Sequence, residues 1–241
     1  MLKRMQLLIT LLVLALTASA KSYVMLVGMA DYPGTRNDLK LSANDAEVMK
    51  ALYGHQDAET VILTNSNATV EAVKKAMTDL FARAGADDAV IMFFSGHGVP
   101  GGFVCYDNLL RYDDITQTML ACPAKVKMVW ADACYSGKAR NTNRRSHKPA
   151  ETSVMFFLSS RTNETSIEKR TWKNSLFTAY LERGLRGGAD TDLNRTITAR
   201  ELFDFVSKGV TESSRNRQHP VMWGNFDNDM PVMSWPKKTD N

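Results

Sequence analysis

A cysteine and a histidine each follow a short, continuously apolar run of the sequence. Cys134 comes directly after Val126–Ala133, and His97 comes directly after Ala89–Gly96. Runs of this length and character are typical of strands buried on both faces of a parallel sheet. The chain between them is long enough for one strand-crossover-strand unit, so both side chains should reach the same carboxyl edge of the sheet. A thiol and an imidazole that meet there form a nucleophile and its base, which indicates an enzyme.

Each of these two residues alone has an ordinary explanation. His97 could be a histidine in a turn, and Cys134 could be a thiol of the buried core. The other histidines, which are His55, His147 and His219, do not follow buried strands. The joint placement of His97 and Cys134 therefore favours the catalytic interpretation.

Strand and helix patterns alternate along most of the chain. The expected strands are 22–29, 60–63, 89–96, 126–133 and 154–158, and the expected helices are 42–53, 70–84, 114–121, 175–185 and 199–210. The helical segment 70–84 has apolar residues spaced three and four apart, as on the buried side of an amphipathic helix. The alternation predicts an α/β domain with a mostly parallel central sheet and helices on both faces.

Two segments of the sequence resemble the signature segments of caspase-like cysteine peptidases, and most closely those of metacaspases and their bacterial relatives. These segments are Ser95-Gly96-His97-Gly98 and Asp132-Ala133-Cys134-Tyr135-Ser136-Gly137. The resemblance extends from the first strand to about Trp235 and includes the helix entry Ser42-Ala43-Asn44-Asp45. It implies a three-layer caspase-like fold and a dyad of Cys134 and His97 that acts on peptide bonds.

The chemistry of the side chains agrees with these implied roles. A free cysteine is only a few per cent thiolate at neutral pH, so an imidazole that takes its proton produces a competent nucleophile. His97 would then protonate the departing amine. The glycines on both sides of His97 leave room for a substrate backbone. By resemblance, the N–H groups of Gly98 and Cys134 form the oxyanion hole, where one donor contributes about 3 to 4 kcal/mol in serine peptidases.

The resemblance also implies the substrate preference. In metacaspase-like enzymes, two aspartates and the serine two residues before the histidine line the pocket for the side chain before the scissile bond, called P1. The matching residues are Asp45, Asp132 and Ser95. Acidic residues there imply cleavage after Arg or Lys, whereas an aspartate-cleaving caspase needs arginine in this pocket. The alternative explanation for Asp45 is a charge that stabilises a helix N-terminus.

Residues 1–20 have the pattern of a secretory signal peptide. Lys3 and Arg4 precede the apolar stretch Leu7–Leu16, and Ala18-Ser19-Ala20 supplies the small residues of a cleavage site. We expect residues 21–241 to form one peptidase domain that is secreted or periplasmic, and a retained membrane anchor is the alternative. The net charge of +4 does not indicate nucleic acid as a partner. The expected partners are protein or peptide substrates with a basic P1 residue, without membrane association after signal removal.

The three cysteines are an odd number for an exported chain. If Cys134 is the free thiol, Cys105 and Cys122 either form a bridge or are two small buried side chains.

The segment 138–152 is basic and has hardly any apolar side chains, so we expect an exposed loop. Its ordinary role is a solvated connection. Because it follows the nucleophile, as the processing linker of related enzymes does, a second hypothesis is autocleavage within Lys138–Lys148.

The segment 190–201 has the spacing of a calcium-binding loop of the EF-hand type. Its candidate ligands are Asp190, Asp192, Asn194, Thr196 and Glu201. Arg195 stands where such loops normally have glycine, and no second loop is present to pair with it. The competing interpretation is a polar turn that ends in a capping box formed by Thr198 and Glu201. By resemblance, Asp107, Asp113 and Asp114 are further calcium candidates, and no cofactor is required for the dyad chemistry.

The leading hypothesis is thus a cysteine endopeptidase with a preference for Arg or Lys. The alternatives are a peptidase with a different P1 preference, an inactive caspase-like binding or assembly module, and a calcium-binding interaction protein. The last of these leaves the dyad unexplained.

Overall fold

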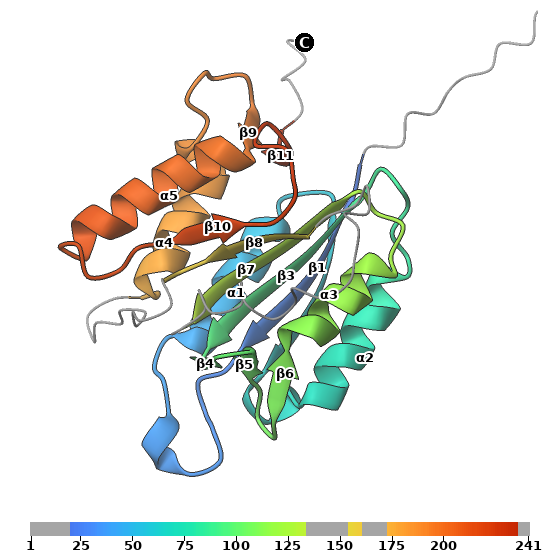
Figure 1. Ribbon diagram of the computed structural model, residues 1–241, viewed down its shortest axis with the longest axis vertical. Helices are drawn as coiled ribbons and strands as arrows, with labels where there is room; N and C mark the ends of the chain where they lie inside the picture. Colours follow the sequence, from blue (N-terminus) through green and yellow to red (C-terminus); the bar gives the residue numbers. More distant parts are fainter. Residues whose placement is uncertain (1–19, 134–153, 161–172, 236–241) are drawn as a thin grey trace, which may run out of the picture.

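The computed structural model of the protein describes residues 20–133, 154–160 and 173–235. Its centre is a six-stranded sheet with the strand order β10-β8-β7-β3-β1-β2 (Figure 1). In this order the strands are β10 (Val221–Trp223), β8 (Val154–Leu158), β7 (Val126–Ala133), β3 (Ala89–Gly96), β1 (Ser22–Gly28) and β2 (Ala58–Thr64). Neighbouring strands of this sheet run parallel, except that β10 runs antiparallel to β8. The predicted mostly parallel α/β sheet is confirmed.

Helices cover both faces of the sheet, as Figure 1 shows. One face carries α1 (Ser42–Tyr53), α4 (Leu176–Arg183) and α5 (Ala199–Ser213), and the other carries α2 (Val70–Phe81) and α3 (Tyr112–Leu120). The strands β3 and β7 are continuously apolar because their alternate residues enter both layers of the core. On β7, for example, Met128 and Trp130 pack on the α1 side, whereas Val129 and Ala131 pack on the α2 side.

The helix boundaries follow from local sequence. At the start of α2, the Thr69 hydroxyl accepts a hydrogen bond from the Ala72 N–H at 3.2 Å, which satisfies a free helix donor. The predicted helix 70–84 is three residues too long, because a turn begins at the cap residue Ala82. The predicted helix 175–185 also differs from the structure at its end, since α4 ends at Arg183 and a π-helical turn, Gly184–Gly188, follows.

Two small sheets and the edge strand β10 were not predicted. One sheet joins β4 (Gly98–Val99), β5 (Gly102–Val104) and β6 (Leu109–Arg111), and the other joins β9 (Thr196–Thr198) and β11 (Pro231–Ser234). Two short 3₁₀ helices, Thr35–Asn37 (η1) and Asn65–Asn67 (η2), lie in connections. Strands of two to four residues show too few alternating positions to be distinguished from loops by sequence pattern.

Cys105 and Cys122 are both free and buried, so of the two interpretations left open by the sequence, the one of two small buried side chains is confirmed. Burial, and then the nearby Asp107 charge, raise the pKa of the Cys105 thiol to about 12, so this thiol stays protonated and unreactive. Within the described ranges, which leave out 1–19, we find no helix with the length and apolar character needed to cross a membrane.

Candidate active site

The two strands that lead to the predicted dyad are neighbours in the sheet. In the parallel pair of β3 and β7, Ser95 lies opposite Asp132, and Gly96 lies opposite Ala133. His97 is the next residue after β3, and Cys134 is the next residue after β7. Cys134 itself lies outside the described residues, as does the basic segment 138–152. The shared edge of the two strand ends is therefore confirmed, while the sulfur-to-nitrogen contact stays a prediction.

The His97 ring is held on one side by a main-chain group. Its Nε2 lies 2.7 Å from the carbonyl oxygen of Asn37, in η1. Because a carbonyl can only accept a hydrogen bond, Nε2 must carry the proton, which leaves Nδ1 unprotonated in the neutral ring. Nδ1 is thus the atom of His97 that can act as a base.

Tyr32 fixes the position of His97 from a second direction. Its hydroxyl accepts the main-chain N–H of His97 at 2.8 Å and donates to the carbonyl oxygen of Val104 at 3.3 Å. The two rings also pack together, with centroids 4.8 Å apart at an angle of 39°. Sequence reasoning missed both Tyr32 and Asn37, because a distant tyrosine and a main-chain carbonyl leave no motif near the histidine.

The room beside Gly96 is already filled by protein. A Cβ at this position would lie 2.7 Å from the Tyr32 hydroxyl oxygen and 2.9 Å from the Met29 Cβ. This glycine therefore admits Tyr32 and not a substrate backbone, which corrects the expectation for this side of His97. Gly98 is buried and begins β4, where it pairs with Phe103. Its role as an oxyanion donor stays a prediction.

Asp45 lies buried at the start of α1 and accepts four hydrogen bonds. Its Oδ2 accepts from the hydroxyls of Ser95 at 2.8 Å and Ser175 at 2.6 Å. Its Oδ1 accepts from the main-chain N–H of Ser175 at 3.0 Å and from Asn174 Nδ2 at 3.2 Å. The predicted neighbours Asp45 and Ser95 are thus in direct contact, and the loop before α4 adds Asn174 and Ser175, which no sequence signal indicated.

Asp132 is the second buried carboxylate of this site. Its Oδ2 accepts from the main-chain N–H of Thr178 at 3.0 Å and from the Thr178 hydroxyl at 2.9 Å. Burial, and then the Asp132 charge, raise the pKa of Asp45 to about 7, although hydrogen bonds from Ser175 and Ser95 oppose the shift. The two carboxylates therefore repel each other in a site that excludes water, and a cation placed between them would relieve that repulsion.

Three of the predicted calcium ligands meet in space. One carboxylate oxygen from each of Asp190, Asp192 and Glu201 lies within 4.8 Å of the others. Arg195 adopts φ +70°, the left-handed conformation that glycine normally supplies at this loop position. Asn194 points its side-chain oxygen at the Thr196 N–H at 2.7 Å. Calcium binding by this loop stays a prediction.

The competing interpretation of this loop, a capping box, is confirmed. The Thr198 hydroxyl accepts from the Glu201 N–H at 3.2 Å, and Glu201 accepts from the Thr198 N–H at 3.0 Å. Burial would raise the pKa of Glu201, but hydrogen bonds from Thr198 and Thr191 outweigh it and lower the pKa to about 2. This carboxylate is therefore ionised at neutral pH.

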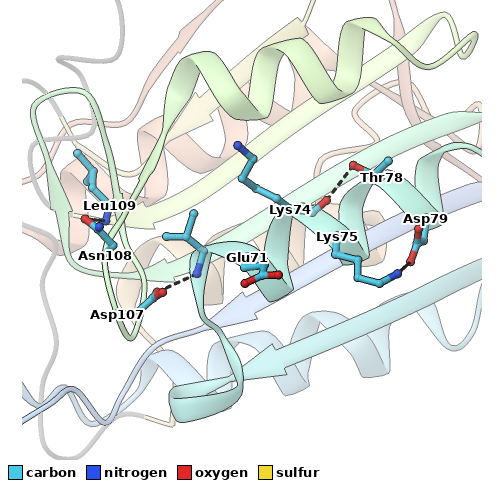
Figure 2. Close-up of a pocket in the computed structure, with 9 residues that line it drawn as sticks. Glu71, Lys74, Lys75, Thr78, Asp79, Asp107, Asn108 and Leu109 are labelled. Atoms are coloured by element: carbon cyan, nitrogen blue, oxygen red, sulfur yellow. Dashed lines mark hydrogen bonds and ion pairs between the residues drawn. The ribbon is translucent and has the colours of Figure 1, made fainter.

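A groove of about 590 Å³ lies elsewhere, on the outer side of α2. Figure 2 shows the residues that line it, which come from α2 and from the turn before β6. Two of its charged side chains have partners, since Lys74 pairs with Asp114 at 3.2 Å and Asp107 accepts the Val70 N–H at 2.8 Å. The groove contains none of the predicted dyad, oxyanion or P1-pocket residues, but the calcium candidate Asp107 is one of its lining residues. Asp107 and Asp114 thus make contacts within this part of the fold, and calcium binding by Asp107, Asp113 and Asp114 stays a prediction.

Comparisons with known proteins agree with this architecture. The chain is 28% identical to metacaspase-4 of Arabidopsis thaliana over 138 residues, which is 47% of this chain and 33% of that protein. The chain thus spans about a third of the length of this relative.

Two solved structures share the fold. A protein from Geobacter sulfurreducens matches with a TM-score of 0.70 at 17% identity, covering 90% of this chain and 100% of that one. Caspase-1 from Spodoptera frugiperda matches with a TM-score of 0.62 at 15% identity, covering 91% and 92%. The model of the caspase domain matches residues 21–230. With its parallel sheet, helices on both faces and neighbouring strand ends before His97 and Cys134, the chain belongs to the caspase domain family.

Proposed function

We propose that this protein is a cysteine endopeptidase that cleaves peptide bonds after Arg or Lys, with Cys134 as nucleophile and His97 as its base. The observation that carries the proposal is the parallel register of β3 and β7, whose last residues pair directly before His97 and Cys134. Adjacent parallel strands end at one edge of the sheet, so a dyad built from these two positions needs no further rearrangement of the fold.

The mechanism uses only side chains, main-chain N–H groups and water. His97 Nδ1 takes the proton of the Cys134 thiol, and the thiolate attacks the carbonyl carbon of the scissile bond. The N–H groups of Gly98 and Cys134 stabilise the oxyanion. The imidazolium then gives its proton to the leaving amine as the C–N bond breaks, and water, deprotonated by His97, hydrolyses the thioester and releases the thiol. The Asn37 carbonyl keeps the other ring nitrogen protonated throughout.

The buried carboxylates support the preference for a basic P1 residue. Asp45 and Asp132 place two acidic groups beside the end of β3, and Ser95 connects to Asp45 directly. An arginine or lysine side chain that enters between them adds two attractive interactions, which offset the repulsion between the two carboxylates. An acidic P1 residue would add a third negative charge, which the site cannot stabilise.

Export and processing form part of the same proposal. Residues 1–20 would direct the chain to a secreted or periplasmic location, and cleavage within Lys138–Lys148 would be catalysed by the enzyme itself, because this segment supplies Arg and Lys. A fully active preparation that stays a single band, or identical bands from Cys134→Ala, would contradict autocleavage.

Hydrolysis of fluorogenic peptides tests the proposed activity. Peptides with Arg, Lys or Asp before the reporter are offered to the wild type, Cys134→Ala and Asp132→Ala, with Cys122→Ala as the control for loss of a thiol. We expect wild type and Cys122→Ala to cleave the Arg and Lys peptides, and Cys134→Ala to be inactive. Cleavage of the Asp peptide would support a different preference. Failure of an arginine chloromethylketone to label Cys134 would support the inactive binding module.

A further inference from the structure

The strand that leads to the nucleophile extends beyond its neighbour β8. The last paired residue of β8 is Leu158, which lies opposite Ala131, and the next main-chain N–H, of Ser159, still donates to the Ala131 oxygen at 2.9 Å. On the other side, β3 pairs with β7 as far as Ala133. β8 therefore offers no strand residue opposite Ala133, although this residue directly precedes Cys134.

Two serine side chains take the place of the missing strand. The Ala133 N–H donates to the Ser159 hydroxyl oxygen at 3.1 Å, and the same hydroxyl donates to the Ala133 carbonyl oxygen at 3.1 Å. The Ser160 hydroxyl also donates to this carbonyl, at 3.3 Å. Both serines are fully buried. A hydroxyl group can accept one hydrogen bond and donate another. The Ser159 side chain therefore makes the two hydrogen bonds that the N–H and C=O of a neighbouring strand would make.

The support for Ser159 comes from a second part of the chain. The buried Gln218, in the connection from α5 to β10, donates through Nε2 to the Ser159 carbonyl oxygen at 3.0 Å. Its own main-chain N–H donates to the Ser214 hydroxyl at 3.0 Å. Ser159 is therefore held from two sides, by its main-chain hydrogen bond to Ala131 of β7 and by Gln218.

We infer that Ser159, assisted by Ser160, is a positioning residue that holds the Ala133 carbonyl oxygen and so sets the plane of the peptide unit that follows β7, whose N–H is the proposed oxyanion donor. The inference rests on the proposed function. A trans peptide unit is planar, with its carbonyl oxygen and its N–H pointing in opposite directions, so holding the Ala133 oxygen fixes the direction of the following N–H. Hydrogen bonds to that oxygen also polarise the amide and strengthen its N–H as a donor.

The inference makes a kinetic prediction. The oxyanion forms only after attack, so a misdirected N–H lowers kcat and leaves KM nearly unchanged. Loss of a whole oxyanion donor lowers kcat about 100- to 1000-fold, so we expect roughly a tenfold to hundredfold fall in kcat for Ser159→Ala. Ser159→Thr keeps the hydroxyl and should retain most of the activity.

NMR spectroscopy monitors this peptide unit directly and does not require the protein to be active. With ¹³C-carbonyl alanine and ¹⁵N cysteine, the chain gives cross-peaks for its two Ala-Cys pairs, Ala121-Cys122 and Ala133-Cys134. Ser159→Ala should move the Ala133-Cys134 peak and leave the Ala121-Cys122 peak in place. Ser159→Thr should keep both peaks near their wild-type positions.

The controls separate orientation from general destabilisation. Val73→Ala removes buried volume from α2 without touching Ala133, and a kcat loss equal to that of Ser159→Ala at equal loss of melting temperature would overturn the inference. An unmoved Ala133-Cys134 peak would overturn it as well. If Ser159→Ala does not fold, Ser160→Ala is measured in the same way, and we expect a smaller shift of its Ala133-Cys134 peak. Absence of Cys134-dependent hydrolysis in the wild type would refute the proposed function, and the peak shift would still decide whether Ser159 orients this unit.

Discussion

Ionisation of the buried Asp45 should make the substrate-free protein less stable as the pH rises. Burial and the nearby Asp132 charge raise the pKa of Asp45 from an ordinary value of 3.8 to about 7. Between these two values the folded protein holds a proton that the unfolded chain has released, so the free energy of unfolding falls with increasing pH. The stabilisation of the protonated form is complete below about pH 4 and is lost by about pH 7.

The magnitude follows from the size of the shift. A shift from 3.8 to about 7 corresponds to roughly 4 kcal/mol at 1.36 kcal/mol per pKa unit. By linkage, roughly 3 kcal/mol of this change in the free energy of unfolding falls between pH 5 and pH 8. Asp45 is fully buried, so solvent does not screen the effect.

Urea unfolding of the wild type and of Asp45→Asn at pH 5, 6, 7 and 8 measures the effect. The difference between the two proteins isolates Asp45, because all other titrating groups are common to both. Asp79→Asn is the matched control for loss of a carboxylate, since the side chain of Asp79 is 63% exposed. Parallel curves for wild type and Asp45→Asn would refute the argument. Asp132→Asn should flatten the wild-type dependence, because it removes a neighbouring negative charge.

The remaining predictions concern Tyr32, which holds the main chain of His97, and the loop before α5. Tyr32→Phe removes the acceptor of the His97 N–H, so kcat should fall about tenfold with little change in KM; wild-type kcat would contradict this role. Thr198→Ala breaks the capping box and should lower the free energy of unfolding by about 1 kcal/mol, measured against Thr211→Ala within α5. Titration calorimetry with calcium on the wild type and on Asp190→Ala tests the loop 190–201. A heat of binding for the wild type alone would support a calcium site. No heat of binding for either protein would leave the capping box as the role of this loop.

Much of the fold and half of the candidate site could be predicted from local pattern. The strands β3 and β7 are long enough and apolar enough to be recognised, and each leads to a residue with reactive chemistry. The proposed P1-pocket residues Ser95, Asp45 and Asp132 were predicted by resemblance to a family motif, and the structure brings them near one another. Their partners Ser175 and Thr178 could not be predicted, since a serine or a threonine at the start of a helix is ordinarily a capping residue.

The sequence by itself determined which segments become buried strands and helices, because burial imposes a local periodicity that can be read without knowing what packs against it. It also determined the chemistry available at the ends of those strands. Only the tertiary structure decided which polar groups meet there. Asp45 and Ser175 are 130 positions apart, and Ser159 reaches Ala133 across 26. Such contacts depend on the order of strands in the sheet and on where each strand ends, and no local pattern encodes either.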